Sequence, residues 1–159
     1  MNFKKHYKIK LKKQNIPIKI SNMKSIIYLT RRVTFSSSHR LYSNKLTEEE
    51  NWKIFDKCSY KNGHGHNYEL FITLKGRANP ITGMLMNVSE LKEIVQKHIL
   101  NEFDHRHLNK DIKEFKSLQP TVENIIIVIW NKLKPQCRNL LYELKLTETE
   151  NIYTTYKGE

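Results

Sequence analysis

The chain has 159 residues, the length of one domain, and its 38% hydrophobic and 28% charged residues are typical of a globular protein. Its formal net charge is +12, but residues 1–22 contain seven lysines and no acidic residue, which leaves +5 for the rest of the chain. This mildly basic body has no basic helix interleaved with aromatic residues and no zinc-finger spacing, so nucleic-acid binding is the minor hypothesis.

Targeting and redox features favour an intracellular protein. Cys58 and Cys137 lie far apart and form no secreted disulfide framework, which indicates a reducing, cytoplasmic compartment. No apolar run is long enough to span a membrane, and no secretory signal is recognised. We interpret residues 1–22 as a disordered basic leader, or as sequence upstream of a start at Met23, and residues 23–159 as one domain.

The first half of the body alternates strand and helix signals. Residues 26–36 are rich in β-branched and aromatic residues and predict a strand, with His39 at its end. Thr47 and Glu50 form a capping box, which predicts a short helix over residues 47–55. A loop over residues 56–63 carries Cys58, and residues 64–75 predict a second strand that ends before a turn at residues 78–83.

The second half predicts two helices followed by two strands. Asn87 caps a helix over about 88–101 that carries His98 on its apolar stripe, at the edge of the core. A loop over 103–109 leads to a second amphipathic helix, which opens at Pro120 and stops at Pro135. Strands follow at 141–148 and 151–157. The order ββααββ predicts an α+β domain with a four-stranded antiparallel sheet, two helices on one face and exposed edges suited to oligomerisation.

A metal site is predicted where the first two strands meet. His64 and His66 are two residues apart and share one face of a strand, and antiparallel pairing would bring His39 beside them. Three histidines leave an open coordination position, as in catalytic zinc sites. In the alternative, Cys58 joins His64 and His66 in a closed structural zinc site; the pair could also be polar residues entering a strand.

A second candidate is the adjacent pair Asp104 and His105 in the predicted loop. A carboxylate can orient an imidazole that accepts and donates protons near neutral pH. The same pair is typical of a solvated turn, which is the interpretation that these residues alone favour.

Seven motifs, in order, resemble the 6-pyruvoyl-tetrahydropterin synthase / 6-carboxy-tetrahydropterin synthase family, from about residue 26 to the C-terminus. They are Arg31 to Ser43 with His39, Cys58 with His64-Gly-His66, Gly83 to Asn87, Asp104-His105 with Leu108, Pro120 to Asn124, Glu148-Thr149 and Tyr156 to Glu159.

The resemblance implies a tunnelling (T) fold, whose ββααββ units form trimers around a β-barrel and stack into a homohexamer with active sites at subunit junctions. It implies conversion of 7,8-dihydroneopterin triphosphate to 6-pyruvoyl-tetrahydropterin, with loss of triphosphate, in tetrahydrobiopterin biosynthesis. Zinc is then bound by His39, His64 and His66, and magnesium accompanies the triphosphate. The resemblance assigns catalysis to Cys58, Asp104 and His105, and binding of the pterin to Glu148, Thr121 and Glu123.

The sequence departs from the family pattern at Asn109, where Asp is more frequent, and at Val122, where a second Thr is common. Relatives that form 6-carboxy-tetrahydropterin place the thiol nearer the two histidines, and others carry Glu in its place and release a hydroxymethyl pterin. Five residues separate Cys58 from His64 here. This spacing favours the pyruvoyl-forming branch over the 6-carboxy and 6-hydroxymethyl alternatives.

Overall fold

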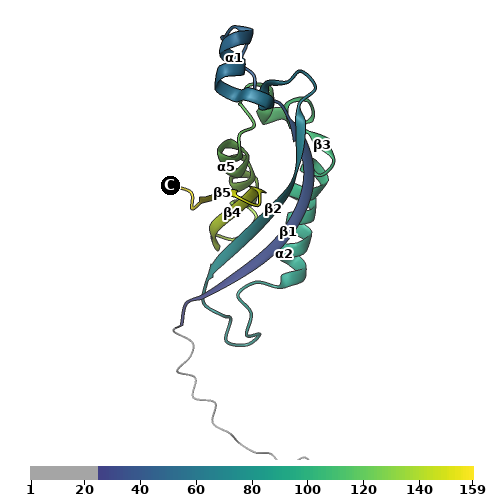
Figure 1. Ribbon diagram of the computed structural model, residues 1–159. Helices are drawn as coiled ribbons and strands as arrows, with labels where there is room; N and C mark the ends of the chain where they lie inside the picture. Colours follow the sequence, from purple (N-terminus) through teal and green to yellow (C-terminus); the bar gives the residue numbers. More distant parts are fainter. Residues whose placement is uncertain (1–24) are drawn as a thin grey trace, which may run out of the picture.

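Two long strands, β1 (Ile27–His39) and β2 (His64–Gly76), form an antiparallel pair that runs the length of the molecule (Figure 1). Their register pairs Ile27 with Gly76 at one end and His39 with His64 at the other. The computed structural model describes residues 25–159. The predicted leader over residues 1–22 and the start at Met23 lie outside the described residues.

Three further strands complete the sheet, whose order is β3-β1-β2-β4-β5. β4 (Leu141–Thr149) is antiparallel to β2, and β5 (Ile152–Tyr156) is antiparallel to β4, as predicted. The expectation of a four-stranded, wholly antiparallel sheet was wrong in one respect, because β3 (Arg106–His107) adds a two-residue parallel strand beside β1. Two residues are too few to show the alternating pattern by which strands are recognised in a sequence.

Two helices begin at the caps that the sequence predicts, and α5 (Val122–Leu133) begins two residues after its predicted start at Pro120. Thr47 and Glu50 form the predicted capping box before α1 (Glu48–Phe55), and Asn87 and Thr121 cap α2 (Val88–Val95) and α5. The predicted helix over 88–101 starts with α2 but changes hydrogen bonding in a π-helical turn, Gln96–Leu100, before α3 (Asn101–Phe103). The segment between α3 and α5 also contains α4 (Leu108–Asp111).

One face of the sheet carries the hydrophobic core. Alternate residues of the central strand β2 are fully buried there, and the apolar sides of α2 and α5 join the same cluster. The members without exposed surface include Leu70, Ile72, Leu74, Leu144, Leu146, Ile125, Ile129 and Leu133. The other face is polar and carries, for example, the ion pair between Arg32 and Glu69. The core therefore fixes which β1 and β2 side chains point toward the helices.

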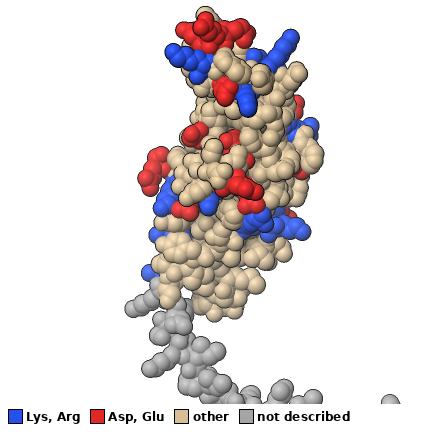
Figure 2. Space-filling model, viewed as in Figure 1, with Lys and Arg blue, Asp and Glu red and all other residues tan. Residues whose placement is uncertain are grey.

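Charge is mixed on the surface. In Figure 2, acidic and basic side chains are interspersed on the face shown, and acidic side chains gather at the end of the molecule where α1 lies. This face shows no continuous basic patch of the kind that a nucleic-acid interface requires. Between residues 25 and 159, no helix is both long and apolar enough to cross a membrane.

Candidate active site

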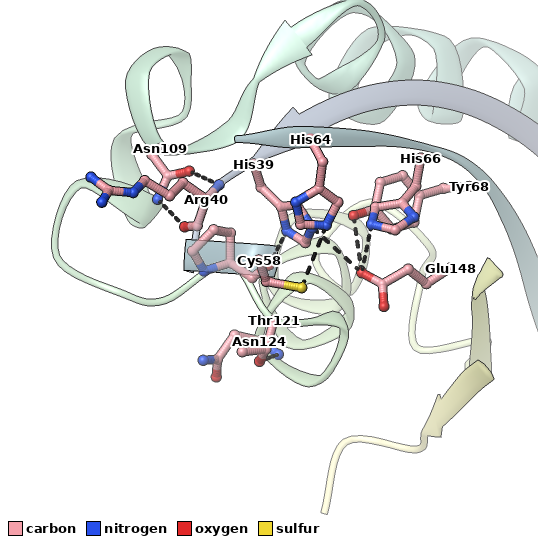
Figure 3. Close-up of polar contacts among 11 residues, drawn as sticks. His39, Arg40, Cys58, His64, His66, Tyr68, Asn109, Thr121, Asn124 and Glu148 are labelled. Carbon is pink, nitrogen blue, oxygen red and sulfur yellow. Dashed lines mark hydrogen bonds and ion pairs between the residues drawn. The ribbon is translucent and has the colours of Figure 1, made fainter. Parts of the chain in front are cut away.

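Three histidine side chains meet at the end of the β1–β2 pair (Figure 3). His39 is the last residue of β1, and His64 and His66 open β2. The pairing of His39 with His64, and of Ser37 with His66, places all three imidazoles on the helix-covered face. Their donor atoms lie within 4.8 Å of one another. The predicted meeting of His39 with the other two histidines is confirmed.

His39 is held rigidly. Its side chain is only 2% exposed, and its Nδ1 lies 2.7 Å from the carbonyl oxygen of Pro120, to which it donates a hydrogen bond. This bond leaves Nε2 with a free lone pair directed at the cluster. Burial lowers the pKa of His39 to about 4 and also lowers the pKa of His64, so both rings are neutral at pH 7. Neutral imidazole is the form that binds metal.

The three nitrogens fit a small divalent cation. His39 Nε2 and His64 Nε2 face each other at 3.0 Å, and the Nε2 atom of His66 is buried without a hydrogen-bond partner. Tetrahedral zinc holds nitrogen ligands at about 2.0–2.1 Å, which places two such ligands about 3.3 Å apart. A cation between these rings would satisfy the unpartnered nitrogen, and the three donor atoms, now within 4.8 Å of one another, would close around it. The cluster can therefore hold a metal ion.

Cys58 lies beside this cluster in the 3₁₀ turn Asp56–Ser59, which α1 and β2 flank. Its sulfur is 3.7 Å from His64 Nε2 (Figure 3). Partial burial, followed by the negative charge of Glu148, raises the pKa of the thiol. The charge of a cation held by the histidines would act in the opposite direction, because it favours thiolate. The thiol is thus within reach of the cation and of any ligand that the cation binds.

Glu148 approaches the cluster from β4. Its Oε1 atom lies 3.8 Å from His39 Nε2 and from His66 Nε2, and its side chain is 14% exposed. The hydroxyl of Tyr68, a fully buried residue of β2, donates a 3.3 Å hydrogen bond to the same oxygen. Burial and this carboxylate raise the pKa of Tyr68, which stays a phenol. Tyr68 therefore orients a carboxylate that can accept hydrogen bonds from a ligand beside the metal position.

Asp104 and His105 lie elsewhere. His105 Nδ1 is 3.0 Å from Asp104 Oδ1, and the same oxygen accepts a 2.9 Å hydrogen bond from the Ser36 backbone N–H, which lowers the pKa of Asp104. His105 is 83% exposed and has a φ of 56°. It lines a cavity of about 550 Å³ with Ser36 and Asn67, whose side chains alternate away from the helix-covered face. His66 borders the same cavity, but among residues 25–159 no hydrogen bond or ion pair joins Asp104 or His105 to the three histidines or to Cys58.

The remaining predicted residues sit at the start of α5. The Thr121 side chain accepts the hydrogen bond from the Asn124 backbone N–H that caps this helix, and Glu123 is exposed in its first turn. The neighbouring Pro120 supplies the carbonyl that orients His39. The described geometry thus gives this segment a part in shaping the cluster.

Two contributors were missed in the sequence. Tyr68 continues the alternation of His64 and His66, so strand periodicity could have placed it on the same face. The carbonyl of Pro120 is a backbone group 81 residues from His39, and no side-chain pattern predicts such a contact.

Comparison with known proteins shows which family the chain resembles over most of its length. The family model "6-pyruvoyl tetrahydropterin synthase" matches residues 28–159. A 6-pyruvoyl tetrahydrobiopterin synthase of Dictyostelium discoideum is 48% identical over 86% of this chain and 100% of its own, and that of Homo sapiens is 43% identical over 82% and 91%. The solved Caenorhabditis elegans 6-pyruvoyl tetrahydropterin synthase superposes with a TM-score of 0.81 at 39% identity, over 85% of this chain and 97% of its own. The chain therefore belongs to the 6-pyruvoyl tetrahydropterin synthase family.

Proposed function

We propose that this protein is a zinc-dependent lyase that converts 7,8-dihydroneopterin triphosphate to 6-pyruvoyl-tetrahydropterin, with elimination of triphosphate, in tetrahydrobiopterin biosynthesis. The observation that carries the proposal is the convergence of three histidines, a thiol and a carboxylate at one point of a chain that belongs to this family. Zinc, held by His39, His64 and His66, would supply positive charge that stabilises negative charge developing on the substrate oxygens.

Each side chain has a role that follows from its position in the site. Glu148, on one side of the histidines, accepts hydrogen bonds from the amino and ring N–H groups of the pterin and fixes the ring. Cys58, beside His64, takes up and returns the proton of a carbon next to a substrate oxygen. Thr121 and Glu123 complete the pterin pocket from the start of α5. Elimination of triphosphate follows from removal of a proton on the carbon adjacent to the one that bears it.

We further propose that Asp104 and His105 act on substrate held by another copy of the chain, in a homohexamer built as two stacked trimers. The resemblance implies active sites at subunit junctions, and the pair is exposed beside β1 rather than facing Cys58. Mixing inactive Cys58→Ala and inactive His105→Ala subunits tests this arrangement. Activity regained in the mixed oligomers would support shared sites, and mixed oligomers that stay inactive would show that both groups belong to one subunit's site.

The reaction branch is tested by the product. The zinc-loaded protein, incubated with 7,8-dihydroneopterin triphosphate and Mg²⁺, should release triphosphate and form 6-pyruvoyl-tetrahydropterin, identified by mass spectrometry. Formation of 6-carboxy-tetrahydropterin or a 6-hydroxymethyl pterin instead would move the protein to another branch of the family. We propose a cytoplasmic location, which fluorescence microscopy of the tagged full-length chain can check.

A further inference from the structure

A second cavity lies next to the loop that carries Cys58. It has a volume of about 420 Å³ and is lined by two basic side chains, Arg40 and Lys61, together with Tyr42, Glu48, Ser59 and neighbouring aromatic residues. Arg40 directly follows the histidine that ends β1, and Ser59 directly follows Cys58. The cavity thus shares two of its wall segments with the candidate active site.

Arg40 is fixed in position. Its Nε donates a 2.7 Å hydrogen bond to the carbonyl oxygen of Ser59, and its guanidinium carbon lies 3.8 Å from the ring centroid of Tyr42. Asn109 holds the Arg40 backbone through bonds of 2.8 Å to its N–H and 3.0 Å to its carbonyl (Figure 3). Within residues 25–159, neither terminal amino group of Arg40 has an acceptor. A guanidinium held at one nitrogen with two amino groups free is suited to binding phosphate oxygens.

The positions of the charged groups in the site indicate which end of a ligand would lie near this cavity. In Figure 3, Glu148 and Arg40 lie on opposite sides of the histidines and Cys58, and the Arg40 side chain extends away from them. A ligand whose ring is held at Glu148 and whose chain runs past the histidines and Cys58 would bring its far end to the Ser59 carbonyl that holds Arg40. In the proposed substrate, the far end is the triphosphate.

We propose that Arg40 and Lys61 bind the triphosphate of the substrate in this cavity, an inference that rests on the proposed function. Glu48 opposes this binding, because its carboxylate lines the same cavity, where it accepts a 2.7 Å hydrogen bond from the Tyr42 hydroxyl. Its negative charge lowers the affinity for an anion and so favours release of the triphosphate after elimination. Arg40 and Lys61 should therefore strengthen anion binding, and Glu48 should weaken it.

Calorimetric titration of the full-length protein with inorganic tripolyphosphate tests this assignment. Arg40→Gln should weaken binding by about tenfold or more, the loss expected for one charge-assisted contact, and Lys61→Ala should weaken it less. Glu48→Gln should strengthen binding. Lys53→Ala, which removes an exposed lysine of α1 outside the cavity, should change nothing. Equal binding by the wild-type, Arg40→Gln and Lys61→Ala proteins would overturn the proposal.

Two further measurements separate a subsite from a structural role. Arg40→Lys keeps the charge and should retain more tripolyphosphate affinity than Arg40→Gln. Binding of 7,8-dihydroneopterin, which has no phosphate, should be the same in Arg40→Gln and wild type, whereas equal losses for both ligands would show that Arg40 only maintains the fold.

Activity measurements separate failure of the subsite from failure of the proposed function. If the wild type forms the product and KM is unchanged in both Arg40→Gln and Lys61→Ala, the subsite alone is rejected. Tripolyphosphate bound through Arg40 without any product would reject the proposed function and the assignment to this substrate.

Discussion

Replacing Cys58 by Ala tests the two roles that a thiol can have beside a metal. The structure assembles three nitrogen donors without the sulfur, and the Pro120 carbonyl orients His39 independently of Cys58. The 3.0 Å between His39 Nε2 and His64 Nε2 is only a few tenths of an ångström short of the spacing of about 3.3 Å in tetrahedral zinc. We therefore expect the variant to keep its zinc.

Turnover should nevertheless fall, because the proton-transfer group is missing. Loss of a general acid–base group costs about 10²- to 10⁴-fold in rate, which corresponds to about 3–5 kcal/mol of transition-state stabilisation. Zinc per chain is measured by plasma mass spectrometry after dialysis, and turnover is measured as triphosphate released from the substrate. Cys137→Ala is the matched control, since Cys137 is a fully buried core residue, and it should retain both zinc and turnover.

Two outcomes would refute the reasoning. If Cys58→Ala loses its zinc while Cys137→Ala keeps it, the sulfur is a metal ligand and the closed structural site of Cys58, His64 and His66 replaces the open one. If Cys58→Ala keeps both zinc and full turnover, the thiol has neither role, and its position 3.7 Å from His64 is incidental.

Three more changes probe the hairpin and the exposed pair. Ile72→Ala, at a fully buried position of β2, should lower the free energy of unfolding by about 3 kcal/mol in urea titrations. Gly63→Ala should weaken zinc binding in competition with a chelating dye, since Gly63 has a φ of 69° and an added Cβ would collide with the His39 carbonyl; unchanged affinity would contradict this. The pKa of Asp104 is lowered by the Ser36 N–H, so its stabilisation is present at neutral pH and is lost as pH falls through the folded-state pKa. The stability gap between wild type and Asp104→Asn should accordingly shrink from pH 7 to pH 3.

Much of the fold could be predicted from the sequence because local sequence signals agree with the observed burial. The capping box at Thr47 and the cap at Asn87 are chemical features of a few adjacent residues, and they mark the starts of α1 and α2 correctly. Alternation along β1 and β2 fixed the face on which His39, His64 and His66 would lie. The metal cluster followed from two strands, their pairing and a period of two.

The parts that could not be predicted depend on contacts between distant segments. The strand β3 exists because the segment after α3 bonds to the edge of β1, as in the 2.6 Å bond from the His105 N–H to the Ser36 carbonyl. The π-helical turn Gln96–Leu100 interrupts a sequence whose apolar spacing is that of an ordinary helix. The orientation of Arg40 depends on Ser59 and Asn109, which no local pattern links to it.

The pairing of His39 with His64 also determines where the chain tolerates changes in length. Side chains of a strand reverse sides at every residue, so a one-residue insertion or deletion within either long strand would turn one imidazole away from the others. The excursion between Arg40 and Gly63 is not subject to this parity, because its two ends are joined by the last pair of the ladder. Foreign peptides could therefore be grafted into this excursion, for example near the exposed Asn44, with the three imidazoles still in contact.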